Sequence, residues 1–204
     1  MRYAIPAFVL AFLLGACGGG EAPVLTTQEY AEAMEDAQAT LQEESEKLDE
    51  DLEQAFEDSL EEMGDRLASL DSEESWSDED AELASEFAET LVRAFTDSLE
   101  GAVGILEDYR DEVSSLRPPA HLAELHGTMT EGFEGLIREA RGVLEDLKDI
   151  DTDIETSAEF DAFWTSFNST LESDLGSGER VDEACQELRD RLEEELNTSV
   201  AMCD

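Results

Sequence analysis

Apolar residues recur along most of the chain at steps of three, four or seven, the spacing that places side chains on one stripe of a helix. No stretch alternates with a period of two for long enough to predict a strand. The first apolar series is Tyr30, Met34, Ala37, Leu41, Leu48, Leu52, Phe56, Leu60, Met63, Leu67 and Leu70. The pattern therefore predicts an all-α fold of about five helices in a mostly antiparallel, up-and-down bundle, with a long first helix.

Breaks in this pattern set the expected ends of the helices. Arg117 precedes two prolines, and a residue before proline disfavours helical geometry, so one helix ends there. Thr156 and Glu159 have the spacing of a capping box that opens a later helix. Gly176-Ser177-Gly178 is expected to break the chain before the final helix. The helices are expected at about 27–70, 83–116, 122–147, 156–171 and 181–196.

The start of the chain departs from the helical repeat. Arg2 is followed by an apolar run from Ala4 to Leu14, and small residues then lead to Cys17. This order of charged, apolar and small residues is that of an export signal, and the run is shorter than the ~20 residues that cross a bilayer. Leu14-Gly15-Ala16-Cys17 resembles a bacterial lipobox, which implies cleavage before Cys17 and lipidation of Cys17. The expected division is a lipoprotein signal peptide at 1–16, a flexible tether at 17–26 and an acidic helical domain at 27–204.

The charge balance is extreme, with 55 Asp and Glu against 12 Lys and Arg and a formal net charge of −43. Nucleic acid is excluded as a partner, because phosphate binding relies on Lys and Arg. Anionic headgroups would repel this surface, so the lipid membrane is expected to be bound through the acyl anchor on Cys17. The acidity has three interpretations: solubility, adaptation to high salt, or attraction of a basic envelope protein or cations.

Two cysteines remain besides Cys17. Cys185 and Cys203 form an even pair in a chain that carries an export signal, and a disulfide is the usual state of such a pair in an oxidising compartment. Two free, buried thiols are the alternative. The disulfide would require the segment after Asn197 to return Cys203 towards Cys185.

Two stretches carry a wider resemblance. They are the double-proline segment from Arg117 to His126, and Ala184-Cys185-Gln186-Glu187-Leu188 together with Val200-Ala201-Met202-Cys203. They resemble a loose group of uncharacterised bacterial exported lipoproteins with an acidic helical domain and a C-terminal cysteine pair. The resemblance supports the extracytoplasmic location and the disulfide, and it implies no activity.

Motifs for metal binding or catalysis are weak. The acidic turn Asp149–Glu155 has oxygen-bearing residues at alternate positions, as a calcium loop does. However, Ile154 and Phe160 occupy the positions where such a loop needs Gly and Glu, so a solvated turn is favoured and no metal or cofactor is expected. His121 and His126 are five residues apart and do not stack on one helical face. His126 is expected to be partly buried and hydrogen-bonded near the double-proline turn.

Two groups of residues inside the predicted helices have competing interpretations. The glycines Gly101, Gly104, Gly127, Gly132, Gly135 and Gly142 are expected mostly to be packing contacts or mild bends, and a ligand groove is the alternative. The aromatic set Phe160, Phe163, Trp164 and Phe167 is expected to be core, and an apolar ligand pocket is the alternative. Trp76 is expected to cap the end of the bundle.

These observations favour a non-enzymatic, membrane-anchored exported lipoprotein that acts as a helical binding or envelope-associated module. The alternative is a small-molecule or divalent-cation-binding protein that uses a cleft between the second, third and fourth helices. A hydrolase with an unrecognised site is a third hypothesis, although no Gly-x-Ser-x-Gly or His-Glu-x-x-His motif occurs.

Overall fold

A computed structural model describes residues 23–59, 76–172 and 176–203, with the side chains of 55–59 excepted, and confirms the all-α prediction. No strand occurs in these ranges. The predicted signal peptide, Cys17, most of the predicted tether and the predicted continuation of the first helix from Leu60 to Leu70 lie outside them. The helices are α1 (Thr27–Ser59), α3 (Asp78–Ser115), α4 (Ala123–Lys148), α5 (Ser157–Leu171) and α6 (Gly176–Leu196).

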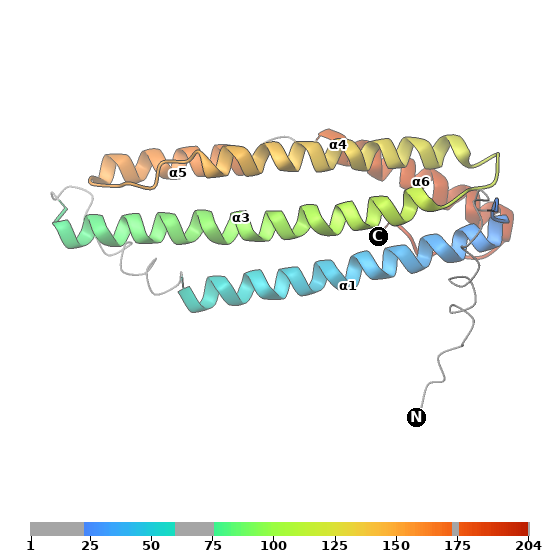
Figure 1. Cartoon of the computed structure of the whole chain (residues 1–204), viewed down its shortest axis with the longest axis horizontal. Coiled ribbons are helices and arrows are strands. Elements are labelled where there is room, and N and C mark those ends of the chain that lie inside the picture. The colour runs from blue at the N-terminus through green and yellow to red at the C-terminus, as the bar shows by residue number, and fades with distance from the viewer. Residues whose placement is uncertain (1–22, 60–75, 173–175, 204) are drawn as a thin grey trace, which may run out of the picture.

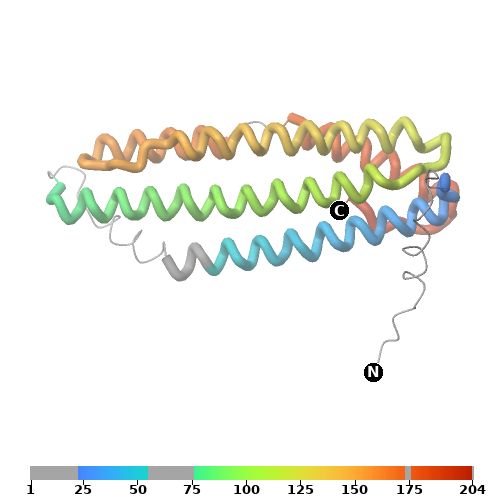
Figure 2. The backbone as a smooth tube through the Cα atoms, in the orientation of Figure 1, coloured from blue at the N-terminus to red at the C-terminus, as the bar shows by residue number. Residues whose placement is uncertain are grey.

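The helices form an elongated antiparallel bundle (Figure 1). α3 runs antiparallel to α1 and to α4, while α5 and α6 follow one another along the bundle in the direction of α3 (Figures 1 and 2). The most extensive contacts join α4 to α6, α1 to α3 and α3 to α4. One end of the bundle, here called the connection end, brings together the start of α1, the α3–α4 connection and the end of α6. There the Leu25 N–H donates to the Arg117 carbonyl at 2.9 Å.

Local capping explains where two of the helices begin. At α3, the Asp80 N–H donates to Ser77 Oγ and the Asp80 carboxylate accepts from the Ser77 N–H, a complete capping box. At α5, the Glu159 N–H donates to Thr156 Oγ1 at 3.3 Å, as the sequence predicts. The Glu159 carboxylate accepts from the Glu155 N–H rather than from that of Thr156. The predicted start of α5 is therefore confirmed, with the return bond shifted by one residue.

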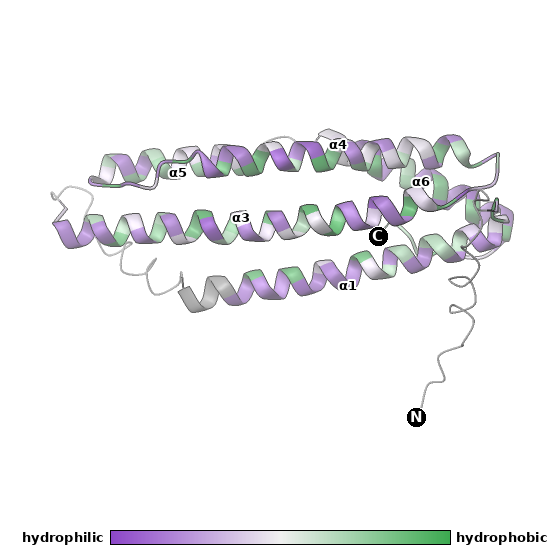
Figure 3. Cartoon of the chain, viewed as in Figure 1, coloured by the Kyte–Doolittle hydropathy of each residue, from purple (hydrophilic) through white to green (hydrophobic). Residues whose placement is uncertain are grey.

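Each helix turns its apolar stripe inward, so hydrophobic residues alternate with strongly hydrophilic outer faces (Figure 3). The core at the connection end joins α1, α3, α4 and α6; its largest members include Tyr30, Met34, Leu122, Met129, Leu188, Leu192 and Met202. The core at the opposite end, here called the aromatic end, joins α3, α5 and the end of α4. Its buried residues are Leu83, Ala84, Phe87, Ala88, Leu91, Leu147, Ile154, Phe163 and Phe167.

Glycines allow α4 to approach its neighbours closely. A Cβ at Gly132 would lie 2.8 Å from Val181 Cγ2, and one at Gly135 would lie 3.0 Å from Ser177 Cβ, both on α6. A Cβ at Gly101 would lie 2.8 Å from Leu48 Cδ1 of α1. The packing prediction is confirmed at these three glycines.

Gly104, Gly127 and Gly142 make no such packing contact. A Cβ at any of them would meet nothing within 4 Å, so no neighbouring helix requires glycine there. Spacing alone does not separate them from the packed glycines, because Gly142 lies seven residues from Gly135 and Gly104 three from Gly101, each near the same helical face.

The expected break at Gly176-Ser177-Gly178 is wrong, because α6 begins at Gly176. The reason is a cap supplied by another helix. The carboxylate of Glu139 on α4 accepts hydrogen bonds from the Ser177 N–H at 3.0 Å and from the Ser177 hydroxyl at 2.7 Å. These bonds lower the pKa of Glu139, and they satisfy an N–H that has no partner within the first turn of a helix.

Two alanine substitutions on α4 test this account of the glycines. Gly132→Ala should lower the free energy of unfolding by about 1–3 kcal/mol, because its methyl group overlaps Val181. Gly142→Ala should raise it by up to about 1 kcal/mol, because alanine is the better helix former and the space is open. Urea denaturation of both variants measures the difference. Equal effects of the same sign would contradict the proposed packing.

Candidate functional site

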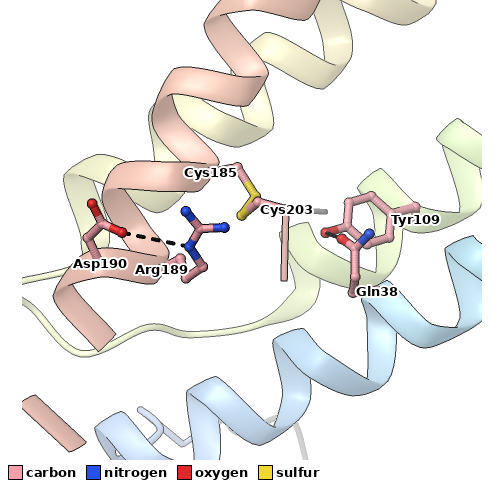
Figure 4. Close-up of a disulfide and its surroundings, with 6 residues drawn as sticks. All are labelled: Gln38, Tyr109, Cys185, Arg189, Asp190 and Cys203. Atoms are coloured by element: carbon pink, nitrogen blue, oxygen red, sulfur yellow. Dashed lines mark hydrogen bonds and ion pairs between the residues drawn. A yellow bond between two sulfur atoms is a disulfide. The ribbon is translucent and has the colours of Figure 1, made fainter. Parts of the chain in front are cut away.

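The predicted cysteine pair is brought together beside α6. The sulfur atoms of Cys185 and Cys203 lie 2.01 Å apart and their Cα atoms 5.7 Å apart, which is disulfide distance (Figure 4). Gln38 of α1 and Tyr109 of α3 lie beside Cys203, where the Tyr109 hydroxyl donates to Gln38 Oε1 in a long hydrogen bond of 3.5 Å. Burial raises the pKa of Tyr109 to about 12, so this phenol stays neutral.

The segment 197–203, here called the strap, carries Cys203 back along α6. Asn197 has φ 51°, a left-handed conformation that asparagine tolerates and that ends the helix. Val200 and Met202 are then buried, with 4% and 1% of their surfaces exposed. Cys203 itself has φ 68°, an unfavourable conformation for a residue other than glycine. The predicted return of the chain after Asn197 is therefore confirmed.

His126 is buried in the core, where its Nδ1 lies 2.9 Å from the Tyr30 hydroxyl oxygen of α1. The prediction of a bonded, partly buried histidine near the double-proline turn is confirmed, but its partner was missed because Tyr30 is distant in the sequence. Burial lowers the pKa of His126 and raises that of Tyr30, so both groups are neutral at pH 7. The hydrogen bond between these two side chains links α1 to α4.

The second histidine has a different environment. His121 is exposed, and its Nε2 lies 2.9 Å from Glu195 Oε1 at the end of α6. The two imidazoles therefore have separate partners and do not share a site, as their spacing predicts. No acid–base dyad is formed between them.

The acidic turn between α4 and α5 is organised by its apolar residue. Ile154 is 2% exposed; its N–H donates to Ser85 Oγ at 2.9 Å, and its carbonyl accepts from the same hydroxyl at 3.2 Å. Asp151 Oδ1 accepts from the Asp153 N–H at 3.1 Å, a local turn bond. Within 23–59, 76–172 and 176–203, no group of three or more His, Cys, Asp or Glu side chains is placed to hold a metal ion.

The aromatic set on α5 is core. Phe163 and Phe167 are buried against α3, with the rings of Phe167 and Phe95 edge to face at 5.1 Å between centroids. Phe160 is partly buried and lies against Trp76, with 5.7 Å between ring centroids. The prediction that Trp76 covers this end of the bundle is confirmed for its contact with α5.

A surface groove lies between α4 and α6, that is, between the third and the last of the predicted helices. Its volume is about 490 Å³. Glu124 and Glu131 line it from α4, and Glu183 and Glu187 line it from α6. Arg180, Arg191 and His121 add positive or protonatable groups, and Arg191 Nη2 lies 3.1 Å from Glu187 Oε1. The groove is thus polar, open and of mixed charge, an arrangement that suits a small polar molecule.

Comparison of the chain with protein-family models, with curated proteins and with solved structures found no match. Among the helices of the described ranges, none has the combination of length and apolarity that a membrane span requires.

The buried imidazole makes a prediction about pH. Because the folded-state pKa of His126 is depressed, its contribution to stability is complete above about pH 6.5 and declines as the pH falls below that value, where the unfolded chain binds a proton. His126→Asn keeps a hydrogen-bonding group for Tyr30 and removes the titration. Urea denaturation between pH 7.5 and about 5.5 should show a smaller acid loss in the variant, while a His121→Asn control keeps it. An identical pH dependence in all three proteins would contradict this role of His126.

Proposed function

We propose that this protein is an exported lipoprotein, anchored through acyl groups on Cys17 and holding an acidic helical bundle outside the cytoplasm as a non-enzymatic binding or envelope-associated module. The observation that carries the proposal is Leu14-Gly15-Ala16-Cys17 directly after a short apolar run. The proposed setting is oxidising, which agrees with two cysteines lying at disulfide distance.

The length of the tether limits how far one end of such an anchored bundle can lie from the membrane. The chain enters the bundle at the connection end, where Leu25 is bonded to Arg117. From Cys17 to Leu25 the backbone reaches at most about 28 Å, at roughly 3.5 Å per residue. α3 has 38 residues and is about 57 Å long at about 1.5 Å per residue. In this proposal the connection end stays within that reach of the membrane.

The proposed binding partners follow from the outer faces. Carboxylates dominate these faces, and 55 acidic residues stand against 12 basic ones. Such a surface attracts basic proteins and cations from a distance and accelerates their encounter, an effect that salt weakens. We therefore propose a basic envelope protein as the partner of the bundle.

Removal of the acceptor sulfur tests the anchor. Cys17→Ala should abolish incorporation of a labelled fatty acid and shift the protein from the membrane fraction to the soluble fraction, because the acyl chains supply the membrane affinity. Cys203→Ala is the matched control and should remain labelled and membrane-bound. Retention of label and membrane binding by Cys17→Ala would refute the anchor.

A second candidate function is binding of a divalent cation or a small polar molecule in the α4–α6 groove. The observation that favours it is the set of four carboxylates on the two walls of that groove. Oxygen ligands of this kind suit calcium, but among the described residues no such group is already placed to hold a metal ion, so discrete binding requires these side chains to move together. The alternative for so acidic a protein is that calcium binds diffusely over its whole surface.

Calorimetric titration with calcium at fixed ionic strength separates these two cases. Discrete binding in the groove should be lost in the double variant Glu131→Gln and Glu183→Gln, which removes one carboxylate from each wall. The control Glu145→Gln with Glu155→Gln makes the same change of net charge at exposed residues outside the groove. Equal, shallow heats for all three proteins would show diffuse binding and reject the groove.

A further inference from the structure

The gap between α1 and α6, here called the seam, is filled mainly by the strap rather than by direct packing of the two helices. α1 packs mainly against α3, and α6 packs mainly against α4, whereas α1 and α6 contact each other only sparsely. The strap, residues 197–203, lies between them. The Ala201 N–H donates to Glu35 Oε1 of α1 at 2.8 Å, and the Val200 N–H donates to Glu193 Oε1 of α6 at 3.1 Å.

Hollows flank the strap on both sides. On one side, a hollow of about 270 Å³ is lined by Gln28, Ala31, Glu32 and Glu35 of α1 and by Leu196, Thr198 and Val200. On the other side, a hollow of about 230 Å³ is lined by Leu41 and Val181 together with Cys185 and Cys203. The hollows at its edges are partly polar, whereas beneath the strap Val200 and Met202 pack into the apolar core.

The cysteine pair is the covalent hold on this segment. Cys185 is 5% exposed on α6, whereas Cys203 is partly exposed on the strap. Cys203 also has a left-handed backbone, which costs on the order of 1 kcal/mol or more and is maintained by the surrounding structure. Once the disulfide is broken, Cys203 can leave that unfavourable conformation, and this gain in free energy favours release of the strap from the seam.

We propose that the bond between Cys185 and Cys203 is a redox latch that keeps the strap in the α1–α6 seam, and that reduction by a dithiol opens the seam while the helices stay folded. A thiolate of the reductant attacks Sγ of Cys203, the more accessible sulfur. The Cys203–Cys185 bond breaks, and its electron pair leaves with Cys185, which takes up a proton. The second thiol of the reductant then displaces Cys203 as a thiolate, which is protonated. The dithiol ends as a disulfide, and the latch has gained two electrons and two protons.

Hydrogen exchange tests the latch on the full-length protein with and without dithiothreitol. Exchange at the amides of Val200 and Ala201 should accelerate by about tenfold or more on reduction, since local opening no longer requires the bond to break. Binding of a hydrophobic fluorescent dye should rise as the seam is uncovered, while the far-ultraviolet helical signal should stay within roughly a tenth of its oxidised value.

The double variant Cys185→Ala and Cys203→Ala is the matched control. It should show the rapid exchange and dye binding without reductant and should not respond to dithiothreitol. Unchanged exchange at Val200 and Ala201 on reduction would overturn the proposal, because packing alone would then hold the strap. Loss of helical signal together with strap protection, or failure of the double variant to fold, would overturn it as well, because the bond would then be a staple for the whole bundle.

Discussion

The bundle depends on the burial of one apolar stripe from each helix, because its outer faces repel one another. The formal net charge is −43, and only 12 Lys and Arg side chains are present to offset that repulsion. The pairs Arg141–Glu107 and Lys148–Glu100 join α4 to α3, but both are exposed, and exposed pairs contribute only about 0–1 kcal/mol. Each isolated helix would be weakened by its own carboxylates. Packing therefore decides which segments become helical, and each helix persists only where a neighbour covers its stripe.

α4 is the helix that organises this packing. One face lies against α3, and another presents Gly132, Gly135 and Glu139 to the start of α6. The glycines remove side chains where Val181 and Ser177 approach, and Glu139 then caps the approaching helix end. Close approach and capping are thus two parts of one contact. They explain why α6 starts within a segment of glycine and serine that favours a turn when considered alone.

Helix number, fold class and the buried face of each helix could be predicted from the sequence, because hydrophobic spacing reports directly on which side of a helix is covered. The cysteine pair was also predictable, since composition limited the choice to two residues. Contacts between segments that are distant in the sequence could not be predicted. The residues around Gly176 do not indicate that Glu139 of another helix caps this end of α6. Likewise, Tyr30 and His126 lie 96 positions apart in the sequence. The α4–α6 groove was missed for the same reason, since spacing along a helix gives its faces but not which neighbouring helix each face meets.

The position of the strap has a consequence for the order of assembly. Residues 197–203 follow in the chain every helix that they contact, and a polypeptide becomes available for folding from its N-terminus during synthesis. α3 and α4 are joined by the short connection 116–122, so their contacts can form early. The seam can be filled only after α6 has emerged and turned back at Asn197. Formation of the Cys185–Cys203 disulfide would therefore indicate a molecule whose helices have already packed together.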